Sequence, residues 1–143
     1  MLDRRRRAES IRRGTAQFLD PGETVLHVVQ VGAGRIKGSA EIMVGDFPAT
    51  VVSQRPARFY GLIATDRNLY AVRLGGERHD KPEGVLLKSA IGRVSVRSNG
   101  NMIYVREDAE TPERGFAVST LFGKRAKKLV EYVSVSQQPG DGD

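Results

Sequence analysis

The sequence predicts a mainly β domain that is closed at one end by a C-terminal helix, and three observations support this fold class. Two runs of aromatic and β-branched residues, at 59–64 and 69–74, flank a polar cluster at 65–68, which is typical of the tight turn in a β-hairpin. An Asn-Gly pair at 99–100 indicates another hairpin. From residue 120 onward the apolar residues recur with the period of a helix.

The length and composition of the chain fit one domain. A chain of 143 residues can bury a core without a disulfide or a structural metal. It contains no cysteine, which excludes disulfides and zinc sites that use sulfur. No run approaches the roughly 18 apolar residues of a membrane span, and no apolar segment follows the charged N-terminus as in a signal peptide. We therefore expect a cytoplasmic protein, with peripheral attachment to a membrane as the alternative.

The first element is predicted to be a basic helix over residues 3–19. Five residues at helical spacing share one face: Ala8, Ile11, Thr15, Phe18 and Leu19. The Asp-Pro-Gly sequence at 20–22 ends the helix, because proline cannot continue it and glycine permits a sharp change of direction. We treat residues 1–19 as a basic N-terminal helix or arm that is added to a core domain spanning 20–133.

The strands follow in hairpins. They number about seven and are expected at 23–31, 59–64, 69–74, 85–88, 93–97, 102–106 and 115–118. A glycine-rich loop at 32–38 ends the first strand, and the segment 39–57 is either a further hairpin or a partly ordered insertion. A polar loop is expected at 75–84. The stretch 85–97 is one long bent strand or two short ones, broken near Gly92, where a bulge would be natural.

The closing helix is predicted over residues 120–133 and is amphipathic. Its apolar side carries Phe122, Ala126, Leu129, Val130 and Val133, and its opposite side carries Lys124, Lys127 and Lys128. One face of this helix is therefore expected to dock on the sheet. Residues 134–143 form a polar tail with too few apolar side chains to order itself.

The order of elements carries a resemblance. The stretch 61–72 is an apolar strand, a Thr-Asp-x-Arg-like turn and a second apolar strand, and Leu87, Ile91 and Val94 stand near a Leu-x-x-Ile-x-x-Val setting with one extra residue between the first two. This pattern resembles the bacterial pleckstrin-homology-like family over roughly residues 20–133. The resemblance implies a strongly bent antiparallel sandwich or barrel with one open end plugged by the last helix.

We find no residue set that amounts to a reaction mechanism. His27 lies in a strand and is expected to be a packed or edge residue, and His79 beside Asp80 is expected to be part of a solvated pair. The acidic stretch 107–113 matches no calcium-loop pattern, and the loop 32–38 lacks the Gly-Lys-Ser/Thr ending of a phosphate-binding loop. We therefore expect no enzyme, no cofactor, no metal and no small-molecule substrate.

Positive charge gathers at the two ends of the chain. The net charge is +6, and residues 1–13 hold six arginines against two acidic residues. The candidate polyanion-binding residues are Arg4, Arg5, Arg6, Arg7, Arg12 and Arg13 near one end and Lys124, Lys127 and Lys128 near the other. The resemblance adds Arg35 and Lys37, which match the loop that grips lipid phosphates in eukaryotic pleckstrin-homology domains. The alternatives are a solvated extension for the arginines and a solubilising pair for Arg35 and Lys37.

Two hypotheses for the function follow. The favoured one is a non-catalytic binding or scaffolding module that recognises protein at a sheet edge or at a groove beside the closing helix. It includes self-association into a homo-oligomer through Ile11, Phe18 and Leu19. The alternative is electrostatic attachment of the basic arm to an anionic membrane, at about 1 kcal/mol for each basic residue near the surface. Nucleic acid is less favoured because no aromatic residues interleave the arginines.

Overall fold

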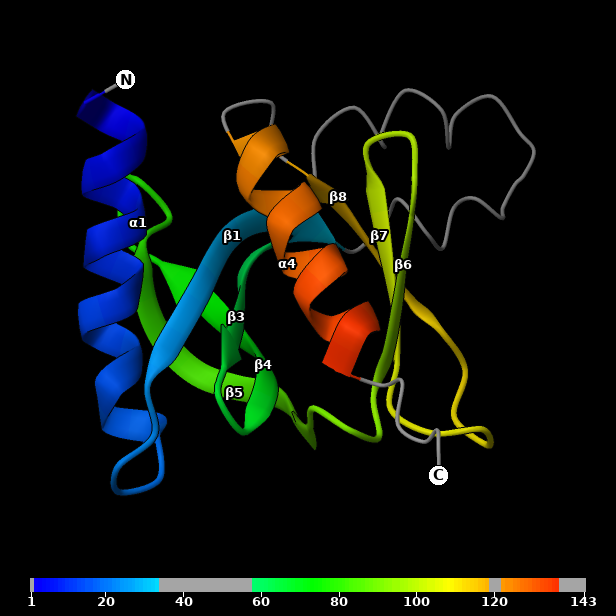
Figure 1. The fold of residues 1–143 in the computed structure, drawn as a ribbon. Helices are drawn as coiled ribbons and strands as arrows, with labels where there is room; N and C mark the ends of the chain where they lie inside the picture. The colour runs from blue at the N-terminus through cyan, green and yellow to red at the C-terminus, as the bar shows by residue number, and fades with distance from the viewer. Residues whose placement is uncertain (1, 34–57, 119–121, 137–143) are drawn as a thin grey trace.

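The computed structural model describes residues 2–33, 58–118 and 122–136 (Figure 1). The elements are α1 Leu2–Thr15, a short 3-10 helix at Ala16–Phe18, β1 Val25–Ala33, β3 Arg58–Thr65, β4 Asn68–Gly75, β5 Lys81–Ala90, β6 Ser95–Asn99, β7 Met102–Arg106, β8 Arg114–Val118 and α4 Gly123–Ser136. The mainly β fold class with an N-terminal and a closing helix is thereby confirmed.

The strands form one antiparallel sheet that bends and is not closed into a barrel. Its order is β5-β4-β3-β1-β8-β7-β6, so β1 joins the two halves of the sheet. Helix α1 packs against β1 and β5, whereas α4 lies across the bend and packs against β1 and β6 (Figure 1). Such a bent sheet plugged by the last helix is the arrangement expected from the sequence, and it places β1 between the two helices.

The hairpin of β3 and β4 lies next to β1 in one half of the sheet. Its register runs from Phe59 opposite Leu74 to Ala64 opposite Leu69, and the inward side chains of both strands are buried. In the turn the Thr65 hydroxyl accepts hydrogen bonds from the backbone N–H groups of Arg67 at 3.1 Å and Asn68 at 2.9 Å. A short polar side chain therefore fixes the turn locally, as the sequence predicted.

Several predicted boundaries were wrong. β5 begins at Lys81 inside the predicted 75–84 loop, because backbone pairing with β4 extends to Gly75 opposite Lys81. Gly92 lies in a turn between β5 and β6 and not in a bulge. α4 begins at Gly123 and continues to Ser136, so residues 134–136 belong to the helix and not to the tail. The segment 39–57 and the remainder of the tail lie outside the described residues.

Helix α1 is docked on the sheet through a small apolar contact. The Ile11 side chain is fully buried, and a Cβ added at Gly61 of β3 would come within 3.1 Å of its Cγ2 atom. A Cβ at Gly14 would meet the Pro82 ring of β5 at 2.5 Å. The two glycines thus allow the helix and the sheet to approach closely. The described part of the N-terminal segment therefore packs on the sheet as part of the domain.

A network of hydrogen bonds stabilises the entry to β1. The Glu23 carboxylate accepts bonds from the Asp20 backbone N–H at 2.8 Å, the Asn68 amide at 2.9 Å, the Tyr70 hydroxyl at 2.7 Å and the Thr65 hydroxyl. Burial raises the pKa of this carboxyl, but the hydrogen bonds outweigh burial and lower the pKa to about 2. The ionised Glu23 side chain therefore connects the segment before β1 to the hairpin of β3 and β4 through hydrogen bonds.

Candidate binding groove

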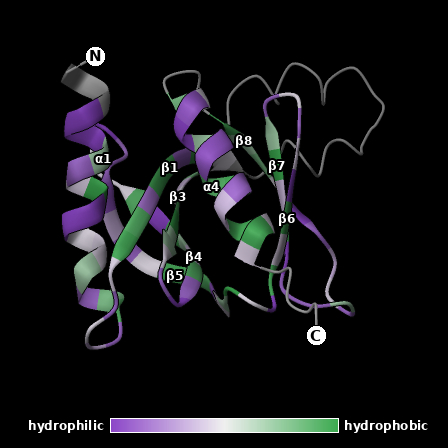
Figure 2. Cartoon of the chain, in the orientation of Figure 1, coloured by the Kyte–Doolittle hydropathy of each residue, from purple (hydrophilic) through white to green (hydrophobic). Residues whose placement is uncertain are grey.

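The basic ends of the sequence lie on either side of β1. Hydrophilic residues are prominent on α1 and on the first turns of α4, and the two helices flank the more apolar β1 strand (Figure 2). The topology explains this arrangement, since α1 and α4 each pack against β1 although they are more than 100 residues apart in sequence. Some of the basic residues of each predicted cluster therefore face one region of the surface.

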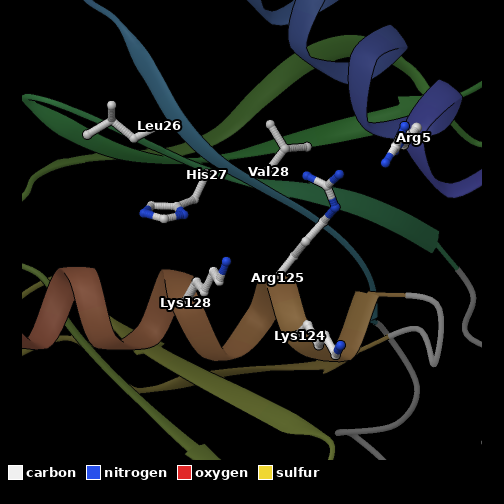
Figure 3. Close-up of a pocket in the computed structure, with 7 residues that line it drawn as sticks. All are labelled: Arg5, Leu26, His27, Val28, Lys124, Arg125 and Lys128. Carbon is white, nitrogen blue, oxygen red and sulfur yellow. The ribbon is translucent and has the colours of Figure 1, made fainter.

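Two adjoining hollows lie along β1 between the helices. The first has a volume of about 450 Å³ and is lined by Arg5, Leu26, His27, Val28, Lys124, Arg125 and Lys128 (Figure 3). The second has a volume of about 410 Å³ and is lined by Arg5, Ala8, Glu9, Arg12, Val25, Leu26, Val28 and Arg125. The two hollows share four residues, so we treat them as one site and call it the basic groove.

The floor of the groove is apolar and contains a β-bulge. In the pairing of β1 with β3, Val25 faces Thr65 and His27 faces Ala64, so Leu26 is an extra residue without a partner. A bulge of this kind redirects a side chain away from the regular ladder. Leu26 is 46% exposed and is one of three exposed large hydrophobic residues in the described part of the chain. The bulge thus presents an apolar contact at the base of cationic walls.

The walls of the groove carry five cations. Arg5 and Arg12 come from α1, and Lys124, Arg125 and Lys128 come from α4. In Figure 3 the Arg125 side chain extends from α4 toward β1, and Arg5 lies on the far side of that strand. Cations from two separate elements therefore surround one recess.

Acidic residues compensate this charge only in part. Glu9 is the one carboxylate in the lining, and it lies 3.8 Å from Arg12 and 3.6 Å from Arg13. Within residues 2–33, 58–118 and 122–136, no ion pair is formed by Arg5, Lys124, Arg125 or Lys128. Lys124 and Arg125 also lie in the first turn of α4, where the helix dipole is unfavourable to cations. The groove therefore has a positive potential that favours an anion.

His27 lies on the α4 side of the groove. Its ring centroid is 5.3 Å from that of Tyr132, and the Tyr132 hydroxyl donates a hydrogen bond to the Thr65 carbonyl at 2.8 Å. Burial lowers the pKa of His27 below its usual value, and the positive charge of Lys128 lowers it further. Burial and Lys128 thus both favour the neutral imidazole.

The remaining predicted basic residues have different positions. Arg6 and Arg13 are exposed on α1 outside the groove lining, and Lys127 lines a separate hollow beside the β6–β7 hairpin. Arg7 is half-buried and donates a hydrogen bond to the Gln30 side chain at 3.4 Å. The Arg4 side chain, Arg35 and Lys37 lie outside the described residues.

The groove residues that were missed as site candidates include Arg125, His27 and Leu26. Arg125 lies three positions before Lys128, so helical spacing alone could have placed both on one face. His27 was identified only as a packed or edge residue. For Leu26 we find no sequence signal, because the bulge follows from the pairing of β1 with β3.

The residues proposed for self-association are engaged within the chain. Ile11 is fully buried, and Phe18 and Leu19 are partly buried against the core. Contacts between copies through Ile11 would require α1 to leave the sheet, whereas Phe18 and Leu19 keep part of their surface exposed. Self-association through this surface stays a prediction.

The described residues offer little that resembles catalytic or metal chemistry. They contain no group of three or more His, Cys, Asp or Glu side chains arranged to hold a metal ion. In the acidic stretch 107–113, Glu113 pairs with Arg97 at 2.9 Å and Asp108 accepts the Thr111 hydroxyl at 2.7 Å. The His79 ring stacks on Phe59 with centroids 4.1 Å apart. From the sequence, a solvated pair of His79 with Asp80 was expected, and this contact was not predicted.

The fold and the groove together define a mainly β domain with a recessed cationic surface between two helices. Comparisons of the chain with protein-family models, with curated proteins and with solved structures found no match. No described helix has both the length and the apolar character that crossing a membrane requires. The function is therefore inferred from the chemistry of the groove.

Proposed function

We propose that this protein is a non-catalytic binding module that recognises a protein partner at the basic groove. The supporting observation is that cations from both ends of the chain converge on one recess whose lining holds a single carboxylate. Like charges held close together cost free energy unless an anion joins them. A positive recess with an apolar floor therefore suits an acidic polypeptide.

The shape of the groove favours protein over a membrane surface. Its cations stand on walls above a recessed floor, whereas a bilayer is broad and would engage the exposed Arg6 and Arg13 equally well. Nucleic acid is less favoured, since single strands bind on aromatic platforms and the lining contains neither Phe, Tyr nor Trp. Electrostatic attachment to an anionic membrane stays the alternative proposal.

A salt series with three anionic probes tests this function. The full chain is mixed with poly-glutamate, with vesicles of phosphatidylcholine and phosphatidylserine, and with duplex DNA, and Arg125→Glu is compared with Lys127→Glu. Both substitutions reverse one charge on α4, but only Arg125 lines the groove. We expect poly-glutamate to bind most tightly and Arg125→Glu to weaken that binding selectively. Tighter vesicle binding that survives Arg125→Glu would support membrane attachment instead.

Self-association is a separate proposal with its own test. Light scattering of the full chain over a range of concentrations reports whether a homo-oligomer forms. A strict monomer at high concentration would contradict it. If an oligomer does form, Phe18→Ala is expected to weaken it, because Phe18 is only partly buried within the chain.

A further inference from the structure

We propose that the partner segment is a short acidic peptide with a central apolar side chain, which seats on Leu26 between the arginines of α1 and α4. This inference rests on the proposed function and specifies what the groove selects. It combines three features of the site, namely an exposed leucine in the floor, a surplus of cations in the walls and a short length.

The floor calls for an apolar group. Three large hydrophobic side chains are exposed among the described residues: Leu26, Val85 and Val135. Of these, only Leu26 lines the groove, and Val28 lies beside it. An apolar ligand side chain placed on Leu26 would remove the remaining apolar surface of both groups from water, which is favourable. A purely charged ligand would leave this contact unused.

The cations of the groove favour carboxylates from another molecule. The groove holds five cations and one carboxylate, and Glu9 is already close to Arg12 and Arg13. The acidic stretch 107–113 of a second copy is a poor occupant, because Arg97 holds Glu113 and hydrogen bonds within the stretch hold Asp108. A separate acidic partner fits the charge better.

The length of the cationic strip sets the length of the segment. Arg5 and Arg12 are seven residues apart on α1, which corresponds to about 10 Å along the helix axis. An extended chain rises by about 3.3 Å per residue, so three or four residues span this distance. The groove therefore suits a segment in which acidic residues stand on both sides of one apolar residue.

Two peptides of equal charge test the inference on the full chain. One is acetyl-Asp-Glu-Leu-Glu-Asp-amide, and the other replaces the leucine with glycine. The variants are Leu26→Ala with Val85→Ala as its matched control, since these side chains are 46% and 42% exposed. Arg125→Glu and Lys127→Glu form a second pair. Dissociation constants are measured by calorimetry at low salt, and circular dichroism checks that each variant is folded.

We expect the leucine peptide to bind about fivefold more tightly than the glycine peptide. Leu26→Ala should abolish this difference, whereas Val85→Ala should preserve it. Arg125→Glu should weaken both peptides about tenfold, and Lys127→Glu should change them little. The comparison of the two peptides on the unmodified chain does not depend on the folding of any variant.

Other results separate the failure of this inference from failure of the proposed function. If both peptides bind equally well and Arg125→Glu weakens both, the apolar contact is overturned while the proposed function stands. If neither peptide shows binding that depends on Arg125, both are overturned. A leucine preference that survives Leu26→Ala would also overturn the inference, because the apolar contact would then lie elsewhere.

Discussion

Charged side chains near the start of β1 fall into two regions. They differ in whether the charge is balanced by partners within the chain. Before the strand, the Glu23 carboxylate accepts four hydrogen bonds from groups on two other segments and its own turn. Farther along, at Leu26 to Val28, the cations of the basic groove converge with little acidic compensation. The first arrangement links separate segments of the fold, whereas the second leaves its positive charge largely uncompensated within the groove lining.

The two regions also shift pKa values for different reasons. At Glu23 burial acts to raise the pKa, but hydrogen bonds to the charged form overcome it and lower the pKa to about 2. At His27 burial and Lys128 both act against the charged form and lower the pKa. Glu23 is thus stabilised in its ionised state by the fold, while the groove disfavours further positive charge.

The largest expected effect comes from removing the α1 wall of the groove. Ile11→Ala deletes a fully buried side chain at the contact of α1 with Gly61, and we expect a loss of about 3 kcal/mol in the free energy of unfolding. Urea denaturation measures this loss. Binding of the acidic leucine peptide should fall as well, because Arg5 and Arg12 leave with α1. Unchanged peptide binding would show that α1 is not part of the site.

Removing the hydrogen-bonded carboxylate of Glu23 should lower the free energy of unfolding by somewhat less. Glu23→Ala leaves the Tyr70 hydroxyl and the Asn68 amide without their acceptor, and we expect a loss of about 2 kcal/mol in the free energy of unfolding. Glu77→Ala, at an exposed position on the β4–β5 loop, is the control and should change stability by less than about 0.5 kcal/mol. Equal effects of the two substitutions would contradict the structural role of Glu23.

The same carboxylate should make stability depend on pH in acid. The folded pKa of Glu23 is about 2 against an ordinary value of 4.5, so its contribution is complete above about pH 4.5 and is lost as the pH falls toward 2. Chemical denaturation at a series of pH values measures the slope. Glu23→Gln should flatten the curve between pH 4.5 and 2. A variant curve parallel to that of the unmodified chain would exclude Glu23 as the source.

Replacing one cation of the groove should raise the free energy of unfolding, whereas replacing Glu23 should lower it. Lys124 lies in the first turn of α4, where a negative side chain interacts better with the helix dipole. Lys124→Glu should therefore raise the free energy of unfolding by about 0.5 kcal/mol while it weakens binding of the acidic peptide. Thermal unfolding and calorimetry measure the two effects. If Lys124→Glu lowers the free energy of unfolding and leaves peptide binding unchanged, Lys124 contributes to the fold, as Glu23 does, and not to binding.

The parts of the fold that were predictable depend on local signals. The turn at Thr65 is fixed by its own hydroxyl, and Gly100 adopts a positive φ of 66° in the predicted Asn-Gly turn. The strand over 81–84 was missed because its lysine, proline and glycine residues are typical of a loop. They form a strand only through pairing with β4, which is a contact distant in sequence.

The candidate site divides in the same way. The basic ends of the chain were visible in the sequence, and Arg5, Arg12, Lys124 and Lys128 were among the candidates that the groove brings together. Their convergence depends on the sheet order, which places β1 between α1 and α4. No local pattern encodes that order. The exposure of Leu26 similarly depends on a shift in strand register.

The most direct test of the central claim is the pKa of His27 with and without the acidic leucine peptide. Proton NMR can resolve the chain's two histidines, and His79 lies outside the groove lining and serves as an internal control. His27 contacts Tyr132, feels the charge of Lys128 and lines the same hollow as Arg125, so carboxylates bound there should raise its pKa. We predict that the bound peptide raises the pKa of His27. Saturating peptide that leaves His27 unchanged would contradict binding in the basic groove.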